Sequence, residues 1–243
     1  MPDVHVMPTP EEAAVAAAAV VAGLADEHGS AAGRFTIALS GGSTARSLYR
    51  ALACDPYAAR VASDRWRVFW SDERGVPPDH DESNYRMARQ ALLDRVCIPA
   101  QEIHRMRGEI EPEEAAAAYG NVVVDTFGNT SPSFDLILLG IGEDGHTASL
   151  FLGTKALRER RKLVVANWAP HLQAHRITFT LPLINKAKNV AFLATDESKA
   201  EMLRDMLEPA QGEPTLPAAM VRPAQGLIQW FVTRDAARLL KTN

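Results

Sequence analysis

Two acids and a histidine follow a nearly unbroken apolar run in the stretch FDLILLGIGEDGHTASLF, residues 134–151. Asp144 and His146 are two residues apart and lie among glycines, so a tight turn would point both side chains into one pocket. An imidazole beside a carboxylate can act as a general base, because the carboxylate fixes its tautomer. We also expect residues 146–151 to begin a helix, whose positive end would favour the neutral imidazole. The alternatives are an ordinary polar loop and a histidine that only caps the helix.

A second stretch, ALSGGSTARSL at residues 38–48, has the composition of a phosphate-binding turn. Gly41 and Gly42 allow the backbone to approach an anion closely, and Ser43 and Thr44 offer hydroxyl donors. The helix that follows adds unpaired N–H groups and the positive end of its dipole. The stretch matches neither the GK[ST] nucleotide loop nor GxGxxG. We therefore predict a phosphate site here; the alternative is a tight turn with an N-cap serine.

A third polar cluster, Asp72, Glu73 and Arg74, ends the predicted strand WRVFWSD, residues 66–72. Taken alone, these residues are typical of a surface turn with a local ion pair. Their position at the end of a strand is what favours a functional role, and we predict that Asp72 and Glu73 belong to a substrate pocket.

Two cations complete the candidate set. Arg176 opens the predicted strand 176–180, and Lys199 lies in the first turn of the predicted helix 196–207. A lysine near a helix N-terminus is unfavourably placed unless it serves an anion. We therefore expect both side chains to be charge partners of a phosphate; the alternative for Lys199 is a solvated surface side chain.

Other catalytic motifs are weak or missing. His171 and His175 are four residues apart, but the glutamate of HExxH is absent between them and no third ligand is in view, so we predict no metal site. No serine occupies a G-x-S-x-G turn, which argues against a serine hydrolase.

These residues must be positioned by alternating strands and helices. Nearly continuous apolar strands separated by helices predict an α/β fold with a mostly parallel sheet and helices on both faces, and ligands in such sheets bind at the carboxyl ends of the strands. The proline-rich residues 208–223 are too short for an interdomain linker, so we predict a single domain over residues 1–243. We predict a first helix that is capped near Thr9 and has Pro10 in its first turn. The further predicted helices span residues 43–53, 82–96, 111–127 and 196–207. The predicted strands span residues 34–40, 66–72, 134–140, 162–167, 176–180, 189–195 and 227–233.

Composition narrows the class of protein. The 243 residues are 47% hydrophobic and 23% charged, which is ordinary for a globular protein, and the net charge of −4 predicts no broad surface for nucleic acid. No apolar run reaches the roughly 18 residues of a membrane span, and acids stand where a signal peptide would carry basic residues. Cys54 and Cys97 form no CxxC pair. We therefore expect a cytoplasmic protein that binds no membrane.

Four motifs in a fixed order resemble the 6-phosphogluconolactonases: LSGGSTARSLYRAL, WSDERGVPPDHDESNYRMARQALL, FDLILLGIGEDGHTASLF and RITFTLPLIN. The resemblance covers nearly the whole chain. It implies a Rossmann-like sheet, no metal or organic cofactor, and a sugar-phosphate substrate. We expect a monomer or weak homo-oligomer, although the sequence does not determine the oligomeric state. The implied reaction is the hydrolysis of 6-phospho-D-glucono-1,5-lactone to 6-phospho-D-gluconate, the second step of the oxidative pentose phosphate pathway.

On this basis we expect His146 to activate a water that attacks the lactone carbonyl, and Asp144 to orient or tune the imidazole. Arg74 would stabilise the oxyanion. Gly41, Gly42, Ser43 and Thr44 would hold the phosphate with Arg176 and Lys199, although the sequence leaves open which of Arg74 and Arg176 serves the carbonyl.

Two alternatives belong to other functional classes. The related glucosamine-6-phosphate deaminases resemble the pattern D-G-H-I-A-F-N-E, in which a glutamate stands five residues after the histidine, whereas this chain has Phe151 there. They also carry Asp-Glu-Tyr where this chain has Asp72, Glu73 and Arg74; release of ammonia from glucosamine-6-phosphate would identify that activity. A non-catalytic sugar-phosphate sensor would bind without turnover, but the roughly 30 residues before the first predicted strand are too few for a helix-turn-helix.

Overall fold

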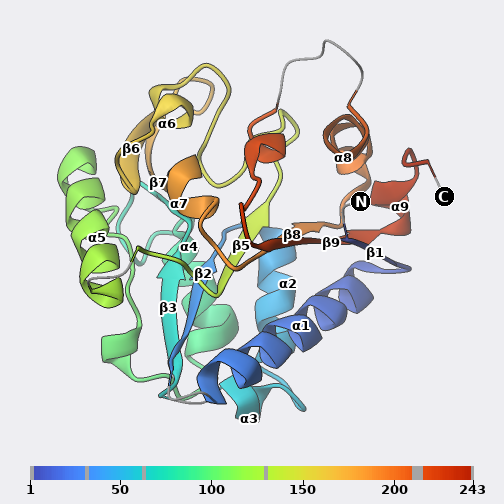
Figure 1. Cartoon of the computed structure of the whole chain (residues 1–243), viewed down its shortest axis with the longest axis horizontal. Coiled ribbons are helices and arrows are strands. Elements are labelled where there is room, and N and C mark those ends of the chain that lie inside the picture. Colours follow the sequence, from blue (N-terminus) through green and yellow to red (C-terminus); the bar gives the residue numbers. More distant parts are fainter. Residues whose placement is uncertain (1–2, 31–32, 62–63, 129–130, 210–215, 242–243) are drawn as a thin grey trace.

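The computed structural model describes residues 3–30, 33–61, 64–128, 131–209 and 216–241, and two sheets organise them (Figure 1). Every neighbouring pair of strands in the larger sheet is parallel. The smaller sheet is antiparallel. The larger sheet has the order β1 (Asp3–Met7), β9 (Leu227–Thr233), β8 (Asn189–Ala194), β5 (Leu136–Gly140), β2 (Phe35–Leu39) and β3 (Trp66–Trp70), and the smaller one has the order β4 (Asp72–Arg74), β7 (Ala174–Phe179) and β6 (Val164–Ala169).

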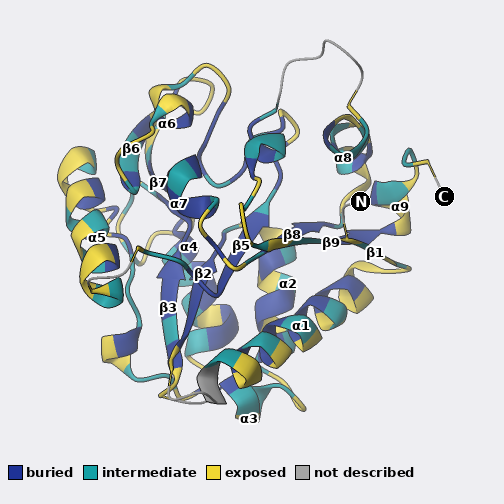
Figure 2. Ribbon diagram, in the orientation of Figure 1, coloured by how far each residue is buried: buried dark blue, intermediate teal, exposed yellow. Residues whose placement is uncertain are grey.

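Helices cover both faces of the larger sheet, and the central strands between them are buried (Figure 2). Strand β5 explains why both faces need a cover: Leu136 and Leu138 pack into one apolar cluster, and Ile137 and Leu139 pack into the other. The predicted α/β class with a mostly parallel sheet is therefore confirmed. The first face carries α1 (Pro10–Ser30), α2 (Ser43–Leu52), α3 (Ala58–Val61), α4 (Asn84–Ala88) and a π-helical turn (Arg89–Leu93), whereas α5 (Pro112–Phe127), α6 (Lys155–Arg158), α7 (Leu181–Ile184), α8 (Ala200–Leu207) and α9 (Arg234–Ala237) contribute to the cluster of the second face.

Some local features of the fold differ from the sequence predictions. Strand β1 was not predicted, because its short mixed segment lies at the sheet edge and is only partly buried. The predicted strand 66–72 ends at Trp70, and Asp72 already belongs to β4 in the other sheet. The predicted helix 82–96 is shorter: the Ser83 hydroxyl caps α4, and the π-helical turn completes it.

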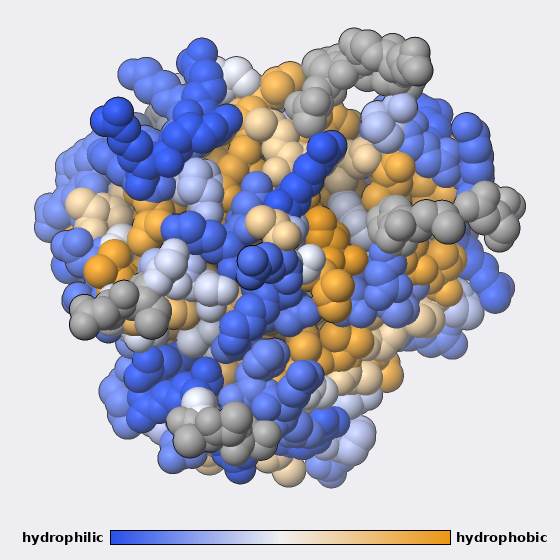
Figure 3. Space-filling model, viewed as in Figure 1, coloured by the Kyte–Doolittle hydropathy of each residue, from blue (hydrophilic) through white to orange (hydrophobic). Residues whose placement is uncertain are grey.

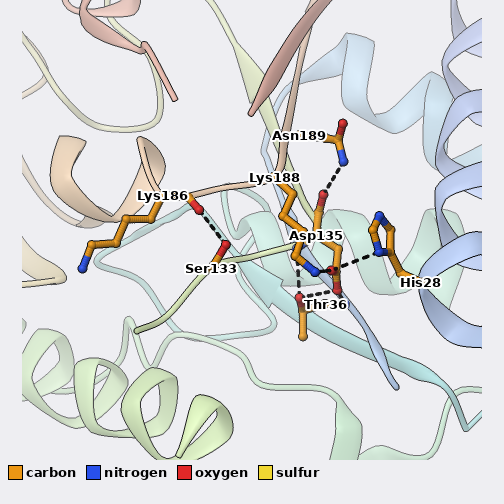
Figure 4. A network of polar contacts seen from close by, with 7 residues as sticks. All are labelled: His28, Thr36, Ser133, Asp135, Lys186, Lys188 and Asn189. Carbon is orange, nitrogen blue, oxygen red and sulfur yellow. Dashed lines mark hydrogen bonds and ion pairs between the residues drawn. The ribbon is translucent and has the colours of Figure 1, made fainter. Parts of the chain in front are cut away.

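A buried carboxylate joins three elements at the amino ends of the strands (Figure 4). Asp135 accepts hydrogen bonds of 2.8 Å from both the N–H and the hydroxyl of Thr36 on β2, and its other oxygen lies 2.7 Å from Lys188 Nζ, just before β8. His28 Nδ1 of α1 lies 3.6 Å from the same carboxylate. Asp135 therefore holds the amino ends of neighbouring strands in register, at the end of the sheet away from the predicted site.

The order of the strands indicates that ligands bind at the opposite end of the sheet. From β2 the chain continues to β3 on one side, and from β5 it continues to β8 and β9 on the other side. Strands β2 and β5 are neighbours, so a crevice is expected at their carboxyl ends.

On the face of the molecule seen in Figure 3, hydrophilic and hydrophobic side chains are mixed. None of the helices in the described parts of the chain is both long and apolar enough to cross a membrane.

Candidate active site

A cavity of about 450 Å³ opens at the carboxyl ends of β2, β5 and β8. This volume is within the roughly 300–1,000 Å³ that is usual for small-molecule sites. The predicted residues that line it are Gly41, Gly42, Ser43, Thr44, Asp72, Arg74, His146, Arg176 and Lys199. Of the remaining predicted residues, Asp144 contacts His146 from outside the lining, and Glu73 lies elsewhere.

His146 and Asp144 form the closest polar pair of the site. His146 Nδ1 lies 2.5 Å from Asp144 Oδ1, and the same oxygen accepts the backbone N–H of His146 at 3.2 Å. Burial alone would raise the pKa of the Asp144 carboxyl, but its hydrogen bonds and charge interaction with His146 hold that pKa below its usual value. An ionised carboxylate can only accept, so in the neutral form of the imidazole the proton is on Nδ1 and the lone pair is on Nε2.

The turn that carries this pair is not the predicted start of a helix. After His146, Thr147 and Leu150 form an isolated β-bridge, and Ala148 has a φ of 48°. The prediction of a helix over residues 146–151 is therefore wrong, and His146 does not lie at the start of a helix. The glycines matter instead, because a Cβ at Gly142 would overlap the imidazole.

The predicted phosphate-binding turn has an open backbone. Gly42 adopts a φ of 99° and is the N-cap of α2, so the N–H groups of the first helical turn have no intrahelical partner. The alternative of a serine N-cap is not what the structure shows, since no side chain caps this helix. Below the turn, the buried Tyr49 hydroxyl donates to the Ser40 carbonyl at 2.8 Å and accepts the Ser40 N–H at 2.9 Å. Thr44 is held by a 3.1 Å contact between its hydroxyl and that of Thr195.

Two guanidinium groups share the cavity. Arg74 and Arg176 are direct cross-strand partners in β4 and β7, and in the described residues neither has a carboxylate within ion-pair distance. The Arg74 guanidinium donates to the Glu82 carbonyl, and Arg176 Nη1 donates to the His175 carbonyl at 3.0 Å. Burial, and then the charge of Arg74, lower the pKa of Arg176. Like charges directly opposite each other destabilise a sheet, so an anion between them would relieve this cost.

Lys199 is mostly enclosed rather than solvated. Its side chain is 20% exposed, and its Nζ lies 3.5 Å from Oε1 of Glu143, whose side chain is 73% exposed. It belongs to a 3₁₀ turn (Glu197–Lys199) that precedes α8. A single exposed carboxylate leaves Lys199 free to exchange this partner for a bound anion.

Asp72 and Glu73 have different places. Asp72 lines the cavity and accepts the Ser149 hydroxyl at 2.7 Å. Glu73 points away from it, and its carboxylate accepts the N–H groups of Arg74 and Asn84 at 2.8 and 2.7 Å. Burial raises the pKa of the Glu73 carboxyl in spite of these bonds. Glu73 therefore joins β4 to α4 and does not line the predicted pocket.

Several lining residues were not predicted. Ser40 and Thr195 directly follow β2 and β8, so the rule for strand carboxyl ends would have found them. The Ser40 hydroxyl is buried without a hydrogen-bond partner among the described residues. Asn84 and Ser149 carry no such signal, because tertiary contacts with Asp72 bring them to the cavity.

His171 and His175 do not come together as a metal site. The His171 ring lies 4.7 Å from Phe151, and the His175 ring lies 4.8 Å from Trp168. No group of three potential metal ligands occurs in the portions of the chain that the structure describes.

Comparisons with known proteins agree on one family. The family model described as "Glucosamine-6-phosphate isomerases/6-phosphogluconolactonase" matches residues 8–230. The 6-phosphogluconolactonase of Rattus norvegicus is 44% identical over 211 residues, which cover 86% of this chain and 81% of the relative, and that of Homo sapiens is 43% identical over 210 residues, covering 85% and 81%. The solved structure of 6-phosphogluconolactonase from Trypanosoma brucei superposes with a TM-score of 0.90 at 29% identity and covers 99% of each chain.

Proposed function

The chain belongs to the family of glucosamine-6-phosphate isomerases and 6-phosphogluconolactonases, and within that family we propose that it hydrolyses 6-phospho-D-glucono-1,5-lactone to 6-phospho-D-gluconate. The rat and human relatives, at 44% and 43% identity over most of their length, carry the name of this activity. The reaction would be the second step of the oxidative pentose phosphate pathway.

The observation that carries the mechanism is the pairing of His146 Nδ1 with Asp144 Oδ1 at 2.5 Å beside the cavity. This contact leaves Nε2 as the base. Nε2 removes a proton from a water molecule as the water oxygen attacks the lactone carbonyl carbon. The same nitrogen then returns a proton to the ring oxygen when the carbon–oxygen bond of the ester breaks.

Positively charged groups would stabilise the negative charges of the substrate and of the transition state. Arg74 would stabilise the tetrahedral oxyanion, with the strongest effect where water is excluded. The phosphate would lie against the first turn of α2, where Gly41, Gly42, Ser43 and Thr44 line the cavity, with Arg176 and Lys199 as counter-charges. Asp72, which also lines the cavity, would contact the sugar.

Phe151 favours lactone hydrolysis over deamination. Its ring lies 4.5 Å from the His146 imidazole and is 4% exposed. A buried aromatic ring cannot relay protons, whereas the glutamate of the deaminase pattern at this position can. Opening of an amino-sugar ring would therefore lack the proton relay that this glutamate supplies in the deaminase pattern.

A coupled assay of lactone consumption and 6-phosphogluconate formation tests the proposal. We expect turnover by the wild-type chain, and a loss of about 10²–10⁴-fold in kcat for His146→Ala, the usual range for a general base. His5→Ala, on the edge strand β1, is the matched control and should retain normal activity. Near-normal turnover of His146→Ala, after subtraction of spontaneous hydrolysis, would remove His146 from the mechanism. Loss of activity with a chelator, restored by zinc, would overturn the expectation of metal-free catalysis.

A further inference from the structure

A second polar cavity, of about 510 Å³, lies between α2 and the segment formed by α4 and the π-helical turn. It shares no lining residue with the candidate active site. Met87 and Ala91 are buried and form its apolar base. Its charged lining consists of Arg46, Arg50, Asp81, Arg86 and Arg95.

Positive charge in this cavity is not balanced by the protein. Asp81 is the one carboxylate in the lining, and it already forms an ion pair with Arg86. The side chains of Arg46 and Arg50 have no hydrogen-bond or ion-pair partner in the part of the chain that the structure describes. The lining therefore carries a surplus of three positive charges, in a chain whose net charge is −4.

Helix α2 places its arginines unfavourably for its own stability. Arg46 and Arg50 are four residues apart, so like charges are neighbours on the same helical face. Arg46 also lies near the positive end of the helix dipole, and no acidic residue occupies the first turn to offset it. Such an arrangement is stabilised when an anion enters between the guanidinium groups.

We propose that this cavity is a second anion site, which binds a small compound that carries two or more linked phosphates. Planar guanidinium groups donate in pairs to phosphate oxygens, and four of them line this cavity: two on α2, one on α4 and Arg95 just after the π-helical turn. A single phosphate would leave part of the surplus charge unmatched, whereas a di- or triphosphate matches it. The volume lies within the roughly 300–1,000 Å³ range of small-molecule sites.

Isothermal titration with inorganic tripolyphosphate tests the site, provided that the active-site cavity is first made less attractive to anions. The background is therefore the double variant Arg176→Gln/Lys199→Gln. In it we expect one remaining tripolyphosphate site, bound more tightly than orthophosphate. Adding Arg46→Gln/Arg50→Gln should weaken the affinity at least about fivefold, since each change removes a charged hydrogen-bond donor. Because binding is measured rather than catalysis, the result does not depend on the proposed lactonase activity.

The matched control adds Arg158→Gln/Arg234→Gln, two exposed arginines on α6 and α9, and should leave the affinity within about twofold despite the same change in net charge. Circular dichroism verifies that each variant is folded. Equal affinity with and without Arg46 and Arg50 would overturn the proposal. So would tighter binding of a single-stranded oligonucleotide than of tripolyphosphate, which would assign the surface to nucleic acid.

A gain of affinity gives an independent check. Asp81→Asn removes the one carboxylate of the lining and releases Arg86 from its ion pair. We expect this variant, in the same background, to bind tripolyphosphate at least about twofold more tightly. Unchanged or weaker binding would contradict the assigned role of these two residues.

Discussion

At the scale of single residues, the orientation of the His146 imidazole depends on Asp144. The 2.5 Å contact fixes which nitrogen carries the proton, and the Phe151 ring limits rotation on one side. The folded-state pKa of Asp144 is lowered, so the contact contributes stability that is fully present above the ordinary aspartate pKa. That stability is lost as the pH falls through the lower folded-state pKa.

Asp144→Asn should therefore lower kcat far more than it changes KM. An amide can donate to Nδ1 and so stabilise the wrong tautomer, and removing such an orienting partner costs between about 10-fold and about 10⁴-fold in other enzymes. Steady-state kinetics at neutral pH measures the effect. In parallel, the difference in thermal stability between wild type and variant should shrink as the pH falls from about 5 to about 3. A kcat within twofold of wild type would exclude an orienting role.

Lys199→Ala should act mainly on KM. The lysine would contact a phosphate that does not change during the reaction, so its binding energy is shared by the ground state and the transition state. Kinetics over a range of lactone concentrations measures the change. Lys186→Ala is a suitable control, because this lysine precedes the amino end of β8, at the opposite end of the sheet, and contributes its backbone carbonyl rather than its side chain to the network around Asp135. An unchanged KM in Lys199→Ala would remove the residue from the phosphate site.

At the scale of elements, the turn from Gly142 to His146 depends on backbone geometry that only glycine adopts readily. Gly145 has a φ of 74°, and a Cβ there would lie 2.9 Å from Leu216 Cδ2 and 3.0 Å from Met202 Sδ. The turn is closed by the Gly142 N–H, which donates to the His146 carbonyl at 2.9 Å. Strain at Gly145 would therefore reach the imidazole directly.

Gly145→Ala should destabilise the fold by about 1–3 kcal/mol and lower kcat as well. The control is Gly120→Ala within α5, where a Cβ meets nothing within 4 Å. That change should leave activity intact and stabilise the protein by up to about 1 kcal/mol, because alanine favours a helix interior. Urea denaturation and the coupled assay measure both effects. If the two variants had equal stability, the geometric argument for Gly145 would fail.

The sequence predicts strands and helices well where the pattern of apolar residues or a capping residue defines them. Strand β5 and helix α5 lie close to their predicted ranges, because the first is apolar throughout and the second directly follows Glu111, whose side chain caps it. The helix after His146 was wrongly predicted because residues 147–151, TASLF, contain no helix-breaking residue. The hydrogen bond that the Ser149 hydroxyl donates to Asp72 joins residues 77 positions apart, so a local pattern could not predict it. Glu73 was wrongly assigned to the pocket for a similar reason. The sequence shows that it follows Asp72, but hydrogen bonds to backbone N–H groups of α4 determine the direction of its side chain.

At the scale of the whole molecule, a single domain over residues 1–243 stays a prediction. The two apolar clusters share the strands β2, β5 and β8, since alternate residues of each strand belong to different clusters. Neither cluster can therefore persist when the sheet between them is lost.

We accordingly expect one equilibrium unfolding transition in urea. Far-ultraviolet circular dichroism should follow the same curve as tryptophan fluorescence, whose buried reporters Trp66 and Trp70 lie in one cluster and Trp230 in the other. Two separated transitions would instead indicate that the chain contains two independently folding units.

The pairing of Arg74 with Arg176 across β4 and β7 also affects how tightly the enzyme holds its product. Opening the lactone adds a carboxylate to a molecule that already carries a phosphate. The gluconate thus complements two facing guanidinium groups better than its precursor does. Accumulated product should then compete for the enzyme, and sustained flux requires a following reaction that consumes the gluconate as it forms.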